Sequence, residues 1–444
     1  MSKHFLIGLL SISLLAAACG DDENSDPVDN NQPDVSNNDV DAVAFADDCT
    51  EFVSPTDDAE QNRLNISEKL ESLSSDSVLC INDGVYPING QLQLNDPNLS
   101  NIEIRGESQD GAVLDFKQQE TGGNGILITG VNNFRAANFT IKNTAGDGIK
   151  VQEADGVELV NLTVTWDGGP KEANGAYGVY PVLTTNVLIE GCVVSNASDA
   201  GIYVGQTKNV IVRNNEAFGN VAGLELENTS FADAHDNHLH DNTGGLLIFD
   251  LPNLTITDGS SNKVHNNLIE NNNQVNFAPG GNIVAQVPRG TGILVLSSSA
   301  NEIHNNTVTG NKSLGLIIAS YLAINQDITD ASYYPYSESN YVHDNTFENN
   351  GTEPDGLALL VSGAPVPDLA FGGIINPDFE SAGDTFEDIR NCFHANTTDG
   401  EPSAFINANL GNATVGALTE CSEDWTDFCN YECEGTVLPA ITLE

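Results

Sequence analysis

Two acidic and two aromatic side chains near the middle of the chain have the types and spacing to do chemistry. Glu225 and Glu227 are two positions apart. Tyr203 precedes Glu225 by 22 residues, and Tyr180 precedes Tyr203 by 23. On a β-strand, side chains two positions apart project from the same face, about 7 Å from each other. Two carboxylates placed in this way can bind Ca²⁺ or take part in proton transfer. The chemistry therefore depends on strands that repeat every 22 or 23 residues.

Such a repeat runs through most of the chain. A glycine followed by aliphatic residues recurs, mostly at intervals of 22 or 23 residues. The glycines that begin these segments are Gly125, Gly148, Gly178, Gly201, Gly223, Gly245, Gly292 and Gly315. A second motif, of which Val264-His265-Asn266-Asn267 is one example, recurs between the glycine-led segments. Asparagine and glycine tolerate the left-handed backbone of a tight corner, so the two motifs indicate short strands separated by corners.

A period of this length predicts a solenoid. Each coil would hold two or three short strands, and only the stacking of coils about 4.8 Å apart would bury a continuous core. Leucine-rich repeats have a similar period, but they carry a fixed leucine scaffold that is absent from this sequence. We therefore expect an all-β chain, a right-handed parallel β-helix solenoid over residues 78–355.

The ends of a solenoid need caps. Residues 57–72 have apolar positions at helical spacing, with Thr56 and Asp57 as candidate N-cap residues. We therefore expect residues 49–77 to form an N-terminal cap with an amphipathic helix. The repeat weakens toward the other end, where cysteines appear. Residues 356–444 are expected to form the last turns and a disulfide-bearing C-terminal cap.

The cysteines favour an oxidising compartment, in which pairing is the default. Cys49 is expected to pair with Cys80 across the N-terminal cap. Four further cysteines can form two bridges of open connectivity: Cys392, Cys421, Cys429 and Cys433. A zinc site built from these four is the alternative, although their spacing lacks two CxxC knuckles. Cys192 then has no expected disulfide partner. Its neighbours in the sequence are mostly apolar, so it is expected to be a buried free thiol.

Residues 1–18 have the features of a lipoprotein signal peptide. A short basic start precedes an apolar run that is too short to cross a bilayer. The string Leu15-Ala16-Ala17-Ala18-Cys19 looks like a bacterial lipobox, so Cys19 is the expected lipidation site, with ordinary cleavage as the alternative. Residues 19–48 are rich in Asp, Asn and Pro and are expected to form a disordered acidic tether. Gly20 after the cysteine favours the outer membrane or the cell surface.

The charge of the chain limits its partners. The formal net charge is −49. Such a surface repels nucleic acid and anionic lipid, so we expect no nucleic-acid partner and contact with a membrane only through the lipid anchor. An acidic polysaccharide would need bridging cations or a local basic patch. The alternative interpretation is that the negative charge serves only to keep the protein soluble.

Long insertions indicate where a binding surface lies. They enter or leave the coil around one strand: residues 166–174 and 274–289 before it, and residues 250–260 and 320–339 after it. Loops on both sides of one sheet would wall a trough above that sheet. The apolar outward residues near the long loops, such as Leu247 and Phe249, are expected to pack beneath them.

The polar part of the trough floor is the candidate site. Within each glycine-led strand, the residue after glycine points into the core and the next points outward. The outward residues of four successive coils are Lys150, Tyr180, Tyr203 and Glu225, with Glu227 beside the last. The tyrosines can stack against sugar rings, and the two glutamates are the candidate metal ligands, with Ca²⁺ as the candidate ion. The alternative is an ordinary polar sheet surface.

Four histidines occupy equivalent repeat positions: His235, His265, His304 and His343. A row of imidazoles on successive coils suggests a series of metal sites, but insertions separate several of these histidines in sequence. Arg213 takes the same position one turn earlier, and neighbouring asparagines mark a corner. We therefore interpret these histidines as a repeat consensus on the surface.

The repeats and one local motif resemble the carbohydrate-processing right-handed β-helix superfamily, which includes pectate lyases, alginate lyases and mannuronan C5-epimerases. The epimerase signature Tyr-Gly-(Phe/Ile)-Asp-Pro-His corresponds to residues 177–182, Tyr-Gly-Val-Tyr-Pro-Val. The following Asn-Gly-x-Asp-Gly corresponds to residues 196–201, which place Asp199 one residue out of register. The signature acid is Tyr180 here, and its histidine is Val182.

This resemblance implies a polysaccharide lyase or an epimerase-like activity if the chain is an enzyme. It makes Lys150, Tyr177 and Asp199 the candidate catalytic residues. The replaced acid and histidine are the proton-transfer groups of the epimerases, which argues against that mechanism. A lyase base at Lys150 would lie about three rungs, or about 14 Å, from Glu225.

As a whole chain, the sequence also resembles a family of bacterial parallel β-helix repeat lipoproteins. That resemblance rests on the repeats, the lipobox and the cysteine-bearing end, and it implies a second exported protein, similar to a c-type cytochrome, as partner. The leading hypothesis is a lipid-anchored protein that binds, and can process, an extracellular acidic polysaccharide. The alternatives are a non-catalytic scaffold that docks a second exported protein, and an adhesin.

Overall fold

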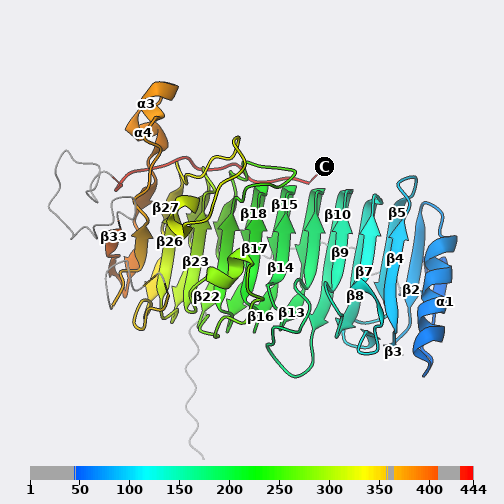
Figure 1. Cartoon of the computed structure of the whole chain (residues 1–444). Helices are drawn as coiled ribbons and strands as arrows, with labels where there is room; N and C mark the ends of the chain where they lie inside the picture. Colours follow the sequence, from blue (N-terminus) through cyan, green and yellow to red (C-terminus); the bar gives the residue numbers. More distant parts are fainter. Residues whose placement is uncertain (1–44, 46, 357, 359–364, 409–430, 444) are drawn as a thin grey trace, which may run out of the picture. The chain divides into compact units, whose positions relative to one another are not determined.

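The computed structural model describes residues 45, 47–356, 358, 365–408 and 431–443. They belong to one compact unit, Phe45–Glu444, in which parallel strands stack coil upon coil (Figure 1). The strands form one sheet of 22 strands and one of 11. Together they make the expected right-handed parallel β-helix, with few helices. Among the described residues, none of the helices combines the length and the apolar character that a membrane span needs.

The 11-stranded sheet, which we call the trough sheet, contains the glycine-led strands. Its strands are β4 (Gly90–Asn95), β7 (Thr121–Thr129), β9 (Ile149–Gln152), β11 (Val179–Val182), β14 (Ala200–Gly205), β17 (Ala222–Glu227), β20 (Gly244–Phe249), β23 (Thr291–Leu296), β26 (Leu314–Ala319), β29 (Leu369–Phe371) and β33 (Phe405–Asn407). The residue after each repeat glycine is buried in the core, as Ile149, Val179 and Ile202 show, each with 0% exposure. The predicted inward and outward alternation is therefore confirmed.

The 22-stranded sheet folds into two faces. The first face contains β1 (Glu51–Val53), β2 (Ser77–Ile81), β5 (Ser100–Gly106), β12 (Thr185–Glu190), β15 (Lys208–Arg213), β18 (Ser230–His235), β21 (Lys263–His265), β24 (Glu302–His304), β27 (Tyr341–His343) and β30 (Cys392–His394). We call it the histidine face. The long strands β8 (Asn132–Lys142) and β10 (Asp155–Thr165) run through both faces.

The second face precedes the trough sheet in each coil. It contains β3 (Gly84–Pro87), β6 (Ala112–Asp115), β13 (Val193–Ser195), β16 (Glu216–Phe218), β19 (His238–His240), β22 (Leu268–Glu270), β25 (Thr307–Thr309), β28 (Thr346–Glu348), β31 (Thr397–Thr398) and the antiparallel β32 (Glu401–Pro402). We call it the lateral face.

Asparagine has two distinct structural roles at the corner between these faces. In the Asn266-Asn267 pair, Asn266 is exposed and left-handed, with φ of 55°, as the sequence predicts. Asn267 is buried, and its Oδ1 accepts hydrogen bonds from the backbone nitrogen and Nδ2 of Asn237 at 3.0 and 2.9 Å. Its own Nδ2 donates to Asn306 Oδ1 at 2.9 Å. The buried asparagines thus form a hydrogen-bonded ladder that supports each corner on the next coil.

A helix covers the N-terminal end of the solenoid, as predicted. This helix, α1 (Ala59–Ser72), buries Ile66 and Leu70. The N-cap prediction of Thr56 or Asp57 is wrong, because Asp58 caps the helix by accepting from Gln61 N at 2.8 Å. Thr56 instead binds the side chain of the buried Asn62. The buried face of the helix therefore includes the polar residue Asn62. Leu64, which the sequence spacing placed on that face, is 38% exposed instead.

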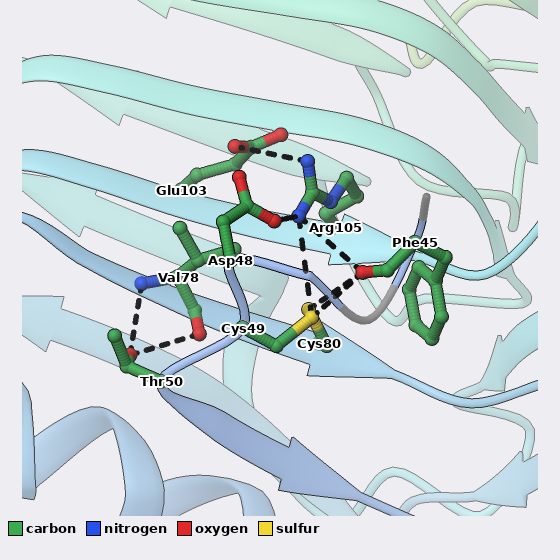
Figure 2. The surroundings of a disulfide bond; sticks show 8 residues. All are labelled: Phe45, Asp48, Cys49, Thr50, Val78, Cys80, Glu103 and Arg105. Atoms are coloured by element: carbon green, nitrogen blue, oxygen red, sulfur yellow. Dashed lines mark hydrogen bonds and ion pairs between the residues drawn. A yellow bond between two sulfur atoms is a disulfide. The ribbon is translucent and has the colours of Figure 1, made fainter. Parts of the chain in front are cut away.

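The predicted Cys49–Cys80 disulfide joins the residues before β1 to β2 (Figure 2). Beside it, Arg105 lies between Asp48 and Glu103 and also donates to the Phe45 carbonyl. Thr50 pairs with the backbone of Val78 on the other side of the bridge. Asp48, at the end of the expected tether, is therefore attached to the first coils. Cys19 and the rest of that tether to residue 44 lie outside the described residues.

The C-terminal end keeps the solenoid pattern as far as β33. A disulfide joins Cys392 of β30 to Cys433, which confirms a bridge in the predicted C-terminal cap. Cys421 and Cys429 lie outside the described residues. Cys192 is a buried free thiol, as predicted, and burial raises its pKa to about 12. Two short helices, α3 (Phe379–Ala382) and α4 (Phe386–Ile389), lie in the insertion before β30.

Candidate functional site in the trough

The structure brings the predicted outward residues together on the trough sheet. Lys150 of β9 pairs in register with Tyr180 of β11. Tyr203 of β14 pairs with Glu225 of β17, and Gly205 pairs with Glu227. The candidate residues therefore occupy neighbouring coils of one surface.

Three tyrosines pack against one another at the centre of this surface. Tyr177 precedes β11, and its ring centroid lies 4.7 Å from that of Tyr180 and 4.4 Å from that of Tyr203. The rings of Tyr180 and Tyr203 meet edge to face at 4.9 Å. Rings packed at these distances restrict one another's orientation, so the packing positions the three hydroxyl groups.

Three carboxyl groups lie next to these tyrosines. Asp199 and Glu225 are each 3% exposed. The Tyr203 hydroxyl donates to Glu227 Oε1 at 2.5 Å, and Asn282 Nδ2 donates to Asp199 Oδ2 at 3.1 Å. Glu225 Oε2 is buried and has no hydrogen-bond partner among the described residues. The cluster therefore contains one buried carboxylate oxygen that has no protein partner among the described residues.

Burial raises the pKa of all three acids. Desolvation, followed by the charge of Glu227, raises the pKa of Asp199 to about 8. Desolvation and the charges of Asp199 and Glu227 raise the pKa of Glu225 well above its usual value. Desolvation also raises the pKa of Glu227, although hydrogen bonds from Tyr203 and Glu225 oppose the shift. Neighbouring carboxylates in a desolvated site cannot all be ionised, so the cluster retains protons near neutral pH.

Glu225 and Glu227 lie in different surroundings. Glu225 is buried and its Oε2 has no hydrogen-bond partner among the described residues, whereas Glu227 accepts a hydrogen bond from the Tyr203 hydroxyl. An accepted hydrogen bond favours the ionised form of a carboxyl group, and burial without a partner favours the protonated form. Two acids whose surroundings separate their proton affinities are the arrangement that general acid–base catalysis uses.

Lys150 is the positively charged residue of the site and lies at the half-buried end of the trough. Lys150 Nζ lies 4.6 Å from the centroid of the Tyr180 ring. Lys150 also opposes the burial that raises the pKa of Asp147 to about 6. Lys150, Gln152, Tyr180 and Glu227 are half-buried, whereas Asp199 and Glu225 are buried. A ligand can therefore reach the cluster from the β9 side.

The long insertions cover the other side, as predicted. The loop that contains η1 (Ile283–Gln286) contributes Val284 and Val287 to a second apolar core with Leu247 and Phe249. The 320–339 insertion adds η2 (Tyr321–Ile324) and Tyr333 to the same core. Asn282 at the start of η1 reaches Asp199, so one loop both closes the trough and holds a cluster acid.

Burial changes the role of one predicted ligand residue. Stacking of Tyr203 against a sugar would need an open ring face, but the side chain is only 4% exposed and packs on Tyr177 and Tyr180. Its hydroxyl instead holds Glu227. Tyr180 remains half-buried and keeps access to the trough.

An apolar cavity lies beneath the loops, and none of the three acids lines it. It has a volume of about 310 Å³ and is lined mainly by apolar groups, including Phe249, Ile283, Val287 and Leu294. Phe249 is the register partner of Glu227, so the cavity begins one coil from the acid cluster. The volume is at the lower end of the range found for small-molecule sites.

The surroundings of Glu225 and Glu227 differ from those of a calcium site. Calcium takes six to eight oxygen ligands that converge on one point. Among the described residues, one set of three acidic, histidine or cysteine side chains has ligand atoms all within 4.8 Å of one another, and it contains neither glutamate. The Ca²⁺ prediction therefore gains no support from the geometry of this cluster.

Sequence reasoning missed three residues of the site. Asn282 lies in an insertion whose path the repeat does not predict, although the preceding Gly280-Gly281 marks a turn. Asp250 follows β20, and burial raises its pKa to about 7, with the Glu227 charge contributing. Asp147 precedes β9 directly before a repeat glycine. A search for acids flanking the glycine-led strands could have found both.

Comparisons with known proteins agree with the architecture. Residues 124–275 match the family model described as the right handed beta helix region. The A-module of a mannuronan C-5 epimerase from Azotobacter vinelandii has a similar structure, with a TM-score of 0.51 at 15% identity, over 78% of this chain and 87% of that one. The chain has the fold of the right-handed β-helix proteins. None of the curated proteins matches its sequence.

Two other solved β-helix structures are more distant. A DFA-IIIase from Arthrobacter chlorophenolicus A6 matches with a TM-score of 0.49 at 10% identity, over 78% of this chain and 87% of that one. An exopolygalacturonase from Thermotoga maritima matches with a TM-score of 0.40 at 12% identity, over 67% and 87% of the two chains. At such identities the likeness concerns the fold alone, so the function of the trough rests on its own residues.

Proposed function

We propose that this β-helix protein binds an extracellular acidic polysaccharide in its trough and cleaves it by acid–base chemistry. The observation that carries the proposal is the pair of acids on β17: Glu225 is buried with an unpartnered oxygen, and Glu227 accepts a hydrogen bond from the Tyr203 hydroxyl. Cleavage of a glycosidic bond needs one protonated carboxyl group to donate to the leaving oxygen and one ionised carboxylate on the other side. Glu225 takes the first role and Glu227 the second.

Asp199 and the tyrosines position this pair. The charge of Asp199 raises the pKa of Glu225, and Tyr203 fixes Glu227 through its hydroxyl. Tyr177 packs against the Tyr203 ring and so helps to orient the hydroxyl that binds Glu227. The three groups therefore give the two acids different surroundings, which a single exposed carboxylate pair would not have.

Lys150 is the reason for proposing an acidic substrate. Its ammonium group lies at the half-buried end of the trough, over the Tyr180 ring, where it can pair with a sugar carboxylate. The net charge of −49 repels polyanions elsewhere, so a local cation is needed.

Export and lipid attachment at Cys19 belong to the same proposal. Disulfides at Cys49–Cys80 and Cys392–Cys433 support an oxidising compartment, where extracellular polysaccharide is available. The anchor would hold the β-helix at the outer membrane or the cell surface. A second exported protein as partner is the alternative, and it would need no acid–base pair.

Turnover of defined oligouronates tests the proposal. The chain should release new reducing ends from oligogalacturonate or oligomannuronate. Glu225→Gln and Glu227→Gln should each lower the rate at least about 100-fold, because they remove the proton donor and the acceptor. Glu348→Gln, an exposed carboxyl on the lateral face, is the matched control and should leave the rate unchanged.

Loss of activity must be separated from loss of folding. Glutamine has the shape of glutamate, and circular dichroism on each variant should show the same β-structure as the parent. If no oligouronate is cleaved, or if both variants cleave as fast as the parent, the proposed chemistry is wrong. Capture of a stoichiometric exported protein without any sugar affinity would favour the scaffold alternative.

A further inference from the structure

A second cluster of side chains lies on the lateral face, outside the trough. It spans three consecutive coils: β16 carries Glu216, β19 carries His238 and His240, and β22 carries Glu270. Glu216 pairs in register with His238, and His240 pairs with Glu270. Residues two apart on a strand share a face, so the two imidazoles project outward between the two carboxylates.

Their ligand atoms converge. The atoms of Glu216, His238 and His240 that can bind a metal all lie within 4.8 Å of one another. His240 Nε2 lies 3.1 Å from Glu216 Oε1, and His238 Nε2 lies 2.8 Å from Glu270 Oε1. Each histidine thus meets the carboxylate diagonal to it, and the two rings stack with centroids 4.2 Å apart.

A second group orients one of the imidazoles. Asp241 Oδ2 lies 2.8 Å from His240 Nδ1, which leaves Nε2 directed at Glu216. Phe218 stacks on the same ring at 5.2 Å, with an interplanar angle of 12°. A carboxylate on the far nitrogen is the usual support of a metal-bound histidine, because it fixes the ring and makes the other nitrogen a better ligand.

We propose that Glu216, His238, His240 and Glu270 form a Zn²⁺-binding site that joins three coils of the β-helix. Two imidazoles and two carboxylates complete a four-coordinate shell, in which neighbouring ligand atoms lie about 3.4 Å apart. The ligand atoms of Glu216, His238 and His240 already lie within 4.8 Å of one another, and Glu270 is the fourth ligand because its Oε1 lies 2.8 Å from His238 Nε2. Imidazole nitrogen selects zinc, copper or nickel over calcium and magnesium, which prefer an all-oxygen shell.

The histidines of the histidine face do not form a comparable site. The rings of His235, His265, His304 and His343 stack in parallel at 4.9 Å, with interplanar angles of 6° to 11°. The insertions between them in sequence do not displace them, because those insertions leave the coil at other corners. Among the described residues, no set of three on this face has converging ligand atoms.

Calorimetric titration with ZnCl₂ tests this proposal on the whole chain, purified without a polyhistidine tag and stripped with chelator. The parent should bind Zn²⁺ at this site, and excess Ca²⁺ should not compete. His240→Ala and Glu216→Gln should each weaken Zn²⁺ binding at least about tenfold, since each removes a ligand. The controls are His235→Ala on the histidine face and Glu348→Gln on the lateral face, and both should bind as the parent does.

Two further measurements distinguish this site from other zinc ligands in the chain. Cu²⁺ in the site should show coupling to two imidazole nitrogens by electron paramagnetic resonance, and His238→Ala should reduce this to one. Zn²⁺ should also raise the melting temperature of the parent but not of the His238→Ala/His240→Ala variant, because a ligand that binds only the folded state stabilises it. Equal Zn²⁺ affinity in that double variant and the parent would overturn the proposal.

Discussion

At the scale of single residues, burial determines the chemistry of the trough. Glu225, Glu227 and Asp199 would be ordinary ionised acids on an open sheet, but the η1 loop and the tyrosines exclude water from them. The protein therefore holds protons that the unfolded chain would release. Lys150 and Tyr180, three and two coils from Glu225, are half-buried and offer a cation and a ring to a ligand.

This proton retention predicts a dependence of stability on pH. Asp199 and Asp250 have folded-state pKa values of about 8 and about 7, raised by burial. Their stabilising contribution is complete below the unfolded-state pKa near 4 and is lost as pH rises through 7 to 8. The free energy of unfolding, measured by urea titration, should therefore fall between pH 5 and pH 8. Asp199→Asn should reduce this fall.

The control for this measurement is Asp110→Asn, because Asp110 is exposed. His304 acts in the opposite direction, since burial lowers its pKa to about 4 and acidification therefore favours unfolding. Comparing variants at equal pH isolates the contribution of Asp199 from that of His304. An unchanged slope in Asp199→Asn would contradict the assignment of a buried, protonated acid.

At the scale of elements, the corners are as important as the strands. Each coil turns at a left-handed residue such as Asn214, Asn266 or Asn305, whose φ values are 56°, 55° and 52°. The asparagine that follows is buried and binds the equivalent asparagine of the next coil. The hydrogen bonds at the corners therefore keep neighbouring coils in register.

Adjacent asparagines give a matched test of this ladder. Asn267→Ala should lower the free energy of unfolding by about 2 to 4 kcal/mol, because it leaves the Asn237 backbone N–H and the Ala234 carbonyl unpaired in the interior. Asn266→Gly should change it by less than about 0.5 kcal/mol, since glycine readily adopts a positive φ. Similar losses in both variants, measured by urea unfolding, would contradict the two separate roles.

The elements also show how far the sequence could predict the structure. The glycine period predicts the trough sheet and its outward column, because stacking makes residues one period apart vertical neighbours. It therefore places Lys150, Tyr180, Tyr203, Glu225 and Glu227 on one surface. The period does not predict the insertions, so the Asn282 contact with Asp199 and the burial of Tyr203 could not be foreseen. The Asp58 cap was missed by one residue, because Thr56 has a competing partner in Asn62.

At the scale of the whole molecule, charge and anchoring set the conditions for function. A net charge of −49 makes the chain a poor ligand for polyanions except where a cation is positioned locally. The proposed anchor at Cys19 and the acidic segment after it would keep the β-helix close to a membrane while repelling it from anionic lipids.

Metabolic labelling tests the anchor. Expressed in a bacterial host with a radiolabelled fatty acid, the chain should incorporate label and remain in the membrane fraction. Cys19→Ser should abolish the label and release the protein, whereas Cys192→Ser, which alters a buried free thiol, should not. Equal labelling of the Cys19→Ser variant would contradict lipidation at this residue.

The central claim is that the trough binds acidic glycan through Lys150. Its most direct test is calorimetric titration of oligogalacturonate and oligomannuronate into the parent, Lys150→Ala and Lys208→Ala. Lys208 is the matched control, because its Nζ lies over the Phe231 ring at 5.3 Å, on the histidine face. We predict that Lys150→Ala weakens binding at least about tenfold through loss of a charged contact, while Lys208→Ala binds as the parent does. Absence of binding in the parent, or equal affinity in all three proteins, would contradict the account.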